Sequence, residues 1–192
     1  MRVGPDGKKM EIHKNLLASI SPELNKHVNN NMREGIEGII HFPEEGEEAL
    51  TLFTEWAYTG DYGHRDVTSG LPVEPKDPWP SLYNHLQLCA FADKFNIPIL
   101  KELAESKFHT EISPIVPSSE SDATSLVIVI GYAYDNLPES HPILKFLAQY
   151  ASWKLALLRA TTGFDKLILA QPTFLREFLL HLSGLTAKPN TP

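Results

Sequence analysis

Proline constrains this chain more than any other residue, because it cannot continue a helix and cannot donate a hydrogen bond within a sheet. The chain has 192 residues, fifteen of them proline, and four prolines crowd together at Pro72, Pro75, Pro78 and Pro80. With two neighbouring glycines and few periodic apolar residues, they predict a long loop over 63–81.

Two further breaks divide the chain. The segment 113–121, with two prolines and four serines, is typical of a linker, and the Pro-containing end, 187–192, predicts a frayed tail. We therefore expect a first domain over 1–112 and a helical C-terminal part over 122–186.

The first 30 residues predict a β-hairpin followed by two short helices. Val3 leads into a Gly-Pro-Asp-Gly turn, and Met10-Glu11-Ile12 leads out of it with alternating apolar and polar side chains. A short helix is expected over 13–20. Ser21 then suits the N-cap of a second helix that runs to about Val28, because proline and glutamate follow it in the first turn.

After these two helices, the sequence predicts one strand and three longer helices. The segment 38–43 predicts a strand that stops at proline. A helix is expected to open at Pro43 and to end at Gly60, and apolar spacing predicts two more helices, over 82–95 and from Leu100 to Phe108.

The C-terminal part is predicted to be helical. Apolar residues recur at helical spacing from Leu144 to Leu158 and again from Leu175 to Leu182, where Gly184 closes the pattern. The apolar pattern of the segment 125–134 fits either a buried helix or a buried strand. Its β-branched residues favour a strand, whereas the helices predicted around it favour a helix.

Composition and charge exclude several classes of protein. Seventeen basic and twenty-four acidic residues give a net charge of -7, so a nucleic-acid-binding face is not expected. The most apolar run, Leu126–Ile130, is far shorter than the ~20 residues that span a membrane. A single cysteine, Cys89, excludes a disulfide framework or a cysteine-rich zinc site and fits an intracellular, reducing compartment.

No catalytic, cofactor-binding or metal-binding set is expected. The chain has no GxSxG, no GxGxxG and no phosphate-binding loop. No two histidines lie three or four residues apart on a predicted helix, and Cys89 sits on an apolar face, where a thiol behaves as a small hydrophobe. The eight histidines are His13, His27, His41, His64, His85, His109, His141 and His181.

Three segments, in order, resemble the signatures of the BTB/POZ domain. Residues 12–22 resemble its His-Lys-x-x-Leu-Ala-x-x-Ser helix, residues 56–62 its aromatic-Ala-Tyr-Thr-Gly helix end, and residues 88–95 its Ala-x-Lys-Phe helix. Trp56, Asp61-Tyr62 and the long Pro-rich loop are similar to features of small fungal BTB proteins. The resemblance implies an α+β fold, a helical cluster flanked by a short β-sheet, followed by an all-α extension. The signature falls on His13, Lys14, Leu17, Ala18, Ser21, Trp56, Tyr58, Gly60 and Phe95.

The resemblance also implies a function. BTB domains are interaction modules, usually homodimeric, and many are substrate adaptors of cullin-type ubiquitin ligases. Met32 and Glu34 occupy the place of the family's hydrophobic-x-Glu cullin-binding motif, in which an apolar side chain fills a pocket and a carboxylate fixes the register. The alternative is an assembly or scaffold domain of a transcription-linked regulator that makes no ligase contact.

Self-association is expected to use the first helix. Leu16 and Ile20 are the candidate surface residues, with Leu17 buried inside the domain; the simpler interpretation is that all three are core. The sequence begins at about the middle of the family's first strand, so the aspartate that would face Lys14 is missing from it.

Overall fold

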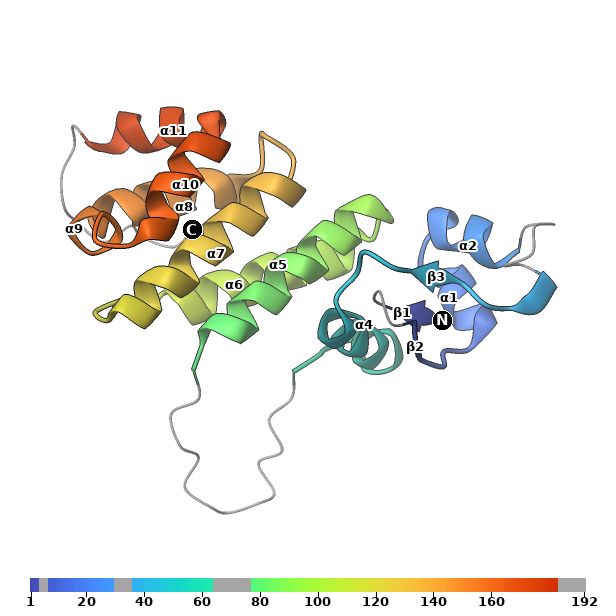
Figure 1. Ribbon diagram of the computed structural model, residues 1–192. Helices are drawn as coiled ribbons and strands as arrows, with labels where there is room; N and C mark the ends of the chain where they lie inside the picture. Colours follow the sequence, from blue (N-terminus) through green and yellow to red (C-terminus); the bar gives the residue numbers. More distant parts are fainter. Residues whose placement is uncertain (4–6, 30–35, 64–76, 183–192) are drawn as a thin grey trace, which may run out of the picture. The chain divides into compact units, whose positions relative to one another are not determined.

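The computed structural model describes residues 1–3, 7–29, 36–63 and 77–182 (Figure 1). These residues are mostly helical and include a small three-stranded sheet, which confirms the expected α+β class. The chain divides into two compact units, one formed by 1–76 and 87–104 and the other by 77–86 and 105–192. The boundary between the units thus runs through two helices, α5 (Trp79–Lys94) and α6 (Pro98–Ile112).

The sheet of the first unit has the order β2-β1-β3. Strand β1 (Arg2–Val3) pairs antiparallel with β2 (Lys8–Lys9) and parallel with β3 (His41–Phe42). The predicted hairpin is confirmed, but its second strand lies at Lys8–Lys9 and not at Met10–Ile12. Backbone hydrogen bonds between Met1 and Met10 continue the pairing by one step, after which the chain turns into the first helix.

Two short helices follow the hairpin, as the sequence predicts. Helix α1 (Lys14–Ile20) is separated from α2 (Pro22–Val28) by Ser21 alone. The buried Ser21 hydroxyl accepts a hydrogen bond from the backbone N–H of Leu24 over 3.0 Å, which satisfies one of the free donors at the start of α2. Ser21 is therefore the N-cap that its sequence context indicates.

Helix α4 (Glu47–Thr59) begins later than predicted. Pro43 does not open it; the chain first makes a turn in which the N–H of Glu45 bonds the carbonyl of Phe42, and Gly46 becomes the N-cap. A Cβ at Gly46 would lie 2.6 Å from the side chain of Gln87, so only glycine fits there without a shift. Gly60 ends the helix in the left-handed region, with φ of 81°, as expected.

Aromatic rings form the centre of the first unit's core. Phe53 of α4 lies 4.8 Å from Phe91 of α5, measured between ring centroids, and Phe91 lies 4.6 Å from Phe95. Phe42 of β3 meets Phe95 edge to face. All four are buried, so this ring cluster joins the sheet to two helices.

The loop predicted over 63–81 ends earlier than expected. Helix α5 already begins at Trp79, where the Asp77 carboxylate accepts a hydrogen bond from the Trp79 backbone N–H over 3.1 Å. Pro80 lies in the first turn of the helix, where its missing N–H has no intrahelical partner to lose. The predicted break between α5 and α6 is confirmed at Asn96, a non-glycine residue with φ of 51°.

The second unit contains α7 (Glu120–Asn136), α8 (Pro142–Trp153), α9 (Leu155–Leu158), α10 (Thr162–Ala170) and α11 (Pro172–Leu182). The ambiguous segment 125–134 is therefore helical. Its β-branched residues Val129 and Ile130 are buried in the core of this unit, and packing overrides their strand preference.

Three predictions for the second unit are wrong in detail. The linker ends at Ser119 and not at residue 121, because Ser119 caps α7. The apolar run from Leu144 to Leu158 is broken at Lys154 into α8 and α9. Helix α11 buries Phe174 and Phe178, whereas Leu179 is 53% exposed, so its buried stripe is displaced from the predicted one.

Some sequence predictions concern residues outside the described part of the chain. Gly184 and the tail 187–192 lie outside the described residues, as does most of the loop 63–81. The domain limits 1–112 and 122–186 stay predictions.

Candidate interaction surface

The first two signature segments meet where Tyr58, near the end of α4, reaches the start of α1. The backbone N–H of His13 donates to the Tyr58 hydroxyl over 3.0 Å, and His13 Nδ1 lies 2.5 Å from the same oxygen. His13 is the N-cap of α1 but makes no side-chain cap of its own. Tyr58 therefore fixes the entry into α1, although it is 51% exposed.

A pocket of about 480 Å³ with mixed polar and apolar lining adjoins this contact. Arg2, Lys9 and Glu11 from the hairpin line it together with His13 and Tyr58. Lys9 forms an ion pair with Glu11 over 2.8 Å, so these two charges largely satisfy one another.

Helix α1 presents the residues expected at a self-association surface. Leu17 is 1% exposed and belongs to the core, while Leu16 and Ile20 are partly exposed. This matches the prediction that Leu17 would be buried and its two neighbours nearer the surface. Whether Leu16 and Ile20 contact a second protein stays a prediction.

The remaining signature residues lie on or near the core of the first unit. Ser21 caps α2, Gly60 ends α4, and Phe95 belongs to the ring cluster. Trp56 packs beside Phe53, and its indole N–H is buried with no hydrogen-bond partner among the described residues. Ala18 is partly exposed and Lys14 is exposed.

Met32 and Glu34, the candidate cullin-binding residues, lie outside the described residues. Their role stays a prediction from the sequence.

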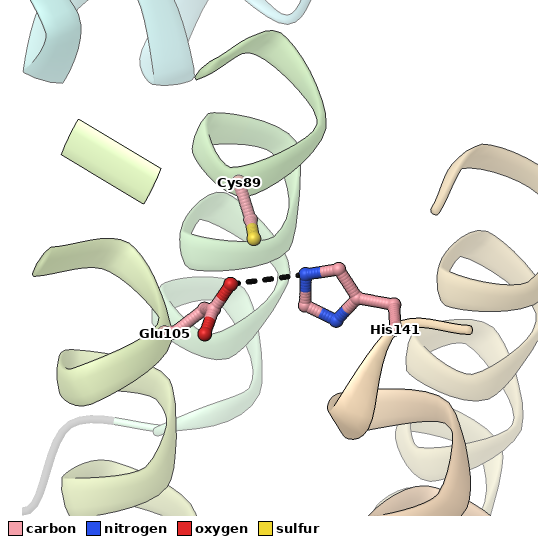
Figure 2. Close-up of side chains that lie close together, drawn as sticks. All are labelled: Cys89, Glu105 and His141. Atoms are coloured by element: carbon pink, nitrogen blue, oxygen red, sulfur yellow. Dashed lines mark ion pairs between the residues drawn. The ribbon is translucent and has the colours of Figure 1, made fainter. Parts of the chain in front are cut away.

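The second unit contains a contact between a buried histidine and a half-buried glutamate that the sequence does not reveal. Figure 2 shows Glu105 of α6 pointing toward His141, the residue before α8, with Nε2 of His141 3.1 Å from Oε1 of Glu105. His141 Nδ1 accepts a hydrogen bond from the backbone N–H of Ile143, so Nε2 carries the proton that points at Glu105. The His141-Pro142 pair resembles an N-cap followed by Pro at N1, but nothing in the sequence links it to Glu105.

Two more histidines face α6 or lie on it. His85 Nε2, on α5, lies 3.4 Å from a Glu111 carboxylate oxygen. His109 packs edge to face on Phe146, and its Nδ1 is buried with no hydrogen-bond partner in the described part of the chain. Burial lowers the pKa of His109, and the neighbouring Glu105 carboxylate opposes that shift.

The pair Glu105 and His141 offers one carboxylate oxygen and one imidazole nitrogen, both of which zinc accepts as ligands. A zinc site takes three or four protein ligands, and within this unit the pair supplies two. Its geometry fits a structural role, since it ties α6 to the start of α8. Cys89, also labelled in Figure 2, is a buried thiol on α5 and belongs to the first unit.

Comparison with known proteins places the chain in no family: no family model matches it, and no curated protein matches it. Among the described residues, no helix is long and apolar enough to cross a membrane.

Proposed function

We propose that this chain is a protein-interaction module of the BTB/POZ type, which associates with itself or with a partner protein. The observation that carries the proposal is that the first two signature segments contact each other and that one buried ring, Phe53, links the second segment to the third. Tyr58 of the second segment holds His13 of the first. The second and third segments are joined through Phe53, which packs on both Trp56 and Phe91.

This convergence matters because the segments are far apart in the sequence. Three short chance matches would have no reason to meet around one core. Instead, their signature residues have local structural roles: Ser21 caps a helix, Gly60 ends another in the left-handed region, and Phe95 is buried in the core. The arrangement supports a binding module more than an enzyme.

Self-association is assigned to α1, where Leu16 and Ile20 leave apolar surface beside the buried Leu17. Size-exclusion chromatography with light scattering at micromolar concentration tests it. We expect the wild-type chain to have the mass of a dimer and Ile20→Glu that of a monomer. Leu169→Glu is the matched control, because Leu169 is 83% exposed on α10 and lies in the other unit. A wild-type monomer at these concentrations would contradict self-association.

Contact with a cullin is assigned to Met32 and Glu34. A pull-down with the N-terminal domain of a cullin, comparing the wild-type chain with the double variant Met32→Ala/Glu34→Ala, tests it. We expect the double variant to lose binding and Glu120→Ala, an exposed acid in α7, to retain it. Equal recovery of wild type and double variant would refute the role of the motif. Dimerisation without cullin binding would leave the assembly-domain alternative.

A further inference from the structure

The pocket beside Tyr58 lies wholly within the first unit, and its charge is opposite to that of the whole chain. The chain has a net charge of -7. The charged side chains that line the pocket are Arg2, Lys9 and Glu11, so two cations stand there against one carboxylate. The pocket is therefore a place of positive charge on an acidic protein.

A row of basic side chains crosses the sheet beside this pocket. Arg2 of β1 stands opposite Lys9 of β2 on one side and opposite His41 of β3 on the other. Residues at one register position point to the same face of a sheet. The next residues, Val3 and Phe42, are buried, so the row faces away from the core. Like charges directly opposite one another destabilise a strand pair, so folding alone does not favour this arrangement.

Arg2 has the least satisfied charge of the row. Lys9 forms its ion pair with Glu11 over 2.8 Å. The Arg2 guanidinium, in contrast, makes no ion pair and no hydrogen bond with any residue that the structure describes. One positive charge of the pocket is therefore left without a carboxylate in the described part of the unit.

Apolar side chains form part of the pocket wall and strengthen an ionic contact made there. Met10, Ile12 and Ile39 line the pocket, and each is partly buried. An ion pair beside such a wall is screened less by water and salt than one on an open surface. The volume of about 480 Å³ is in the range of ligand sites and leaves room for a side chain of another protein.

We propose that this pocket binds an acidic segment of a partner protein, with one carboxylate bonded to the Arg2 guanidinium through two parallel hydrogen bonds. The inference rests on the proposed function, because it names the chemistry of the partner that an interaction module would bind. Charge complementarity selects an anion. The single unmatched guanidinium selects a carboxylate over a doubly charged phosphate, which Glu11 in the same pocket would repel more strongly.

Amide chemical shifts of the nitrogen-15-labelled full chain provide the test. The probes are the acetylated peptide amide Ala-Glu-Glu-Ala, its uncharged counterpart Ala-Gln-Gln-Ala, and inorganic phosphate, all at about 0.1 M salt. We expect the glutamate peptide to shift the signals of Arg2, Lys9 and Tyr58 saturably. The glutamine peptide should leave them in place, and phosphate should bind more weakly than the glutamate peptide.

Two variants of Arg2 locate the binding. Arg2→Gln removes the unmatched charge and should weaken binding of the glutamate peptide on the order of tenfold. Arg2→Lys keeps the charge but loses the planar fork, so its affinity should be intermediate. Lys26→Gln is the matched control and should leave binding unchanged, because Lys26 is an exposed cation on α2 of the same unit and does not line the pocket. Circular dichroism melts show whether the variants are folded.

Four results would overturn the inference: equal weakening by Arg2→Gln and Lys26→Gln, wild-type affinity in Arg2→Lys, shifts spread evenly over the basic surface, or phosphate bound at least as tightly as the glutamate peptide. The proposed function fails separately. A dimer that does not bind the glutamate peptide refutes only the pocket, and a monomer that binds it refutes only self-association.

Discussion

Asp122 carries the most densely bonded side chain of the second unit. Its carboxylate accepts hydrogen bonds from the backbone N–H groups of Ser118 and Ser119, each over 2.9 Å, and from the indole Nε1 of Trp79 over 3.0 Å. Its own backbone N–H donates to the Ser119 hydroxyl, which completes a capping box at the start of α7. One side chain therefore both caps α7 and ties it to the start of α5.

Replacing Asp122 with alanine should destabilise the chain by roughly 2–4 kcal/mol. The alanine variant keeps the Ser119 cap but loses the bonds that the Asp122 carboxylate accepts from the Ser118 and Ser119 backbone N–H groups, which costs about 1 kcal/mol. The alanine variant also removes the acceptor of the Trp79 indole N–H. Because Trp79 is only 4% exposed, water does not readily replace that acceptor, and a buried unsatisfied donor costs about 1–3 kcal/mol. Asp122→Asn, which keeps one acceptor oxygen, should cost less than alanine.

Urea unfolding followed by tryptophan fluorescence and by far-ultraviolet circular dichroism measures this cost. The two signals should give one transition midpoint, since only then is a free energy of unfolding defined. Glu139→Ala, an exposed acid before α8, is the control and should change stability by less than about 0.5 kcal/mol. A cost below about 0.5 kcal/mol for Asp122→Ala would refute the reasoning.

The pH dependence gives a second check on Asp122. The hydrogen bond from Ser118, followed by that from Trp79, holds the carboxyl pKa far below its usual value of 3.8. The folded state thus binds this proton less readily than the unfolded state. The stabilisation is complete above the unfolded pKa and is lost as the pH falls below it. The difference between wild type and Asp122→Ala should shrink below about pH 4.

Three further predictions concern other parts of the fold. Phe53→Ala, at a fully buried ring, should cost about 3–5 kcal/mol in urea unfolding, and less than about 2 kcal/mol would show that the site collapses. Gly60→Ala should cost about 1–2 kcal/mol from backbone strain alone, because no atom lies near the added Cβ, and Gly60→Asn should cost less. His109 has its folded pKa lowered by burial, so stability should fall as the pH drops below its ordinary value of 6.5. Thermal melts of His109→Leu should lack that loss, and an unchanged acid response would contradict it.

Local signals predicted the first unit well. Ser21 and Gly60 act through their own backbone neighbourhood, and the sequence next to each is enough to indicate a cap or a stop. The sequence predicts too early a start for α4, because a proline followed by acids is typical of a first helical turn. The chain instead makes a turn at Phe42–Glu45 and begins the helix after Gly46, whose close neighbour Gln87 lies far along the chain and in no local pattern.

The second unit shows the other limit of sequence patterns. Phe174 and Phe178 are buried on α11 while Leu179 and Leu180 are exposed, although all four are apolar. Apolar spacing alone does not decide which of two overlapping stripes faces the core. The contact between Glu105 and His141 cannot be predicted from the sequence either. The two residues lie on separate elements, and no sequence motif surrounds either of them.

The division of the chain bears on how the C-terminal helices should be understood. The start of α5 and the end of α6 group with the C-terminal helices in one compact unit, and Leu82, Leu86, Phe108 and Ile112 of these two segments are fully buried. Trp79 bonds Asp122 and His141 bonds Glu105 within the same unit. A cut after Ile112 would remove Asp122 and His141 together with these two contacts, so we expect a chain that ends there to be less stable than the full chain.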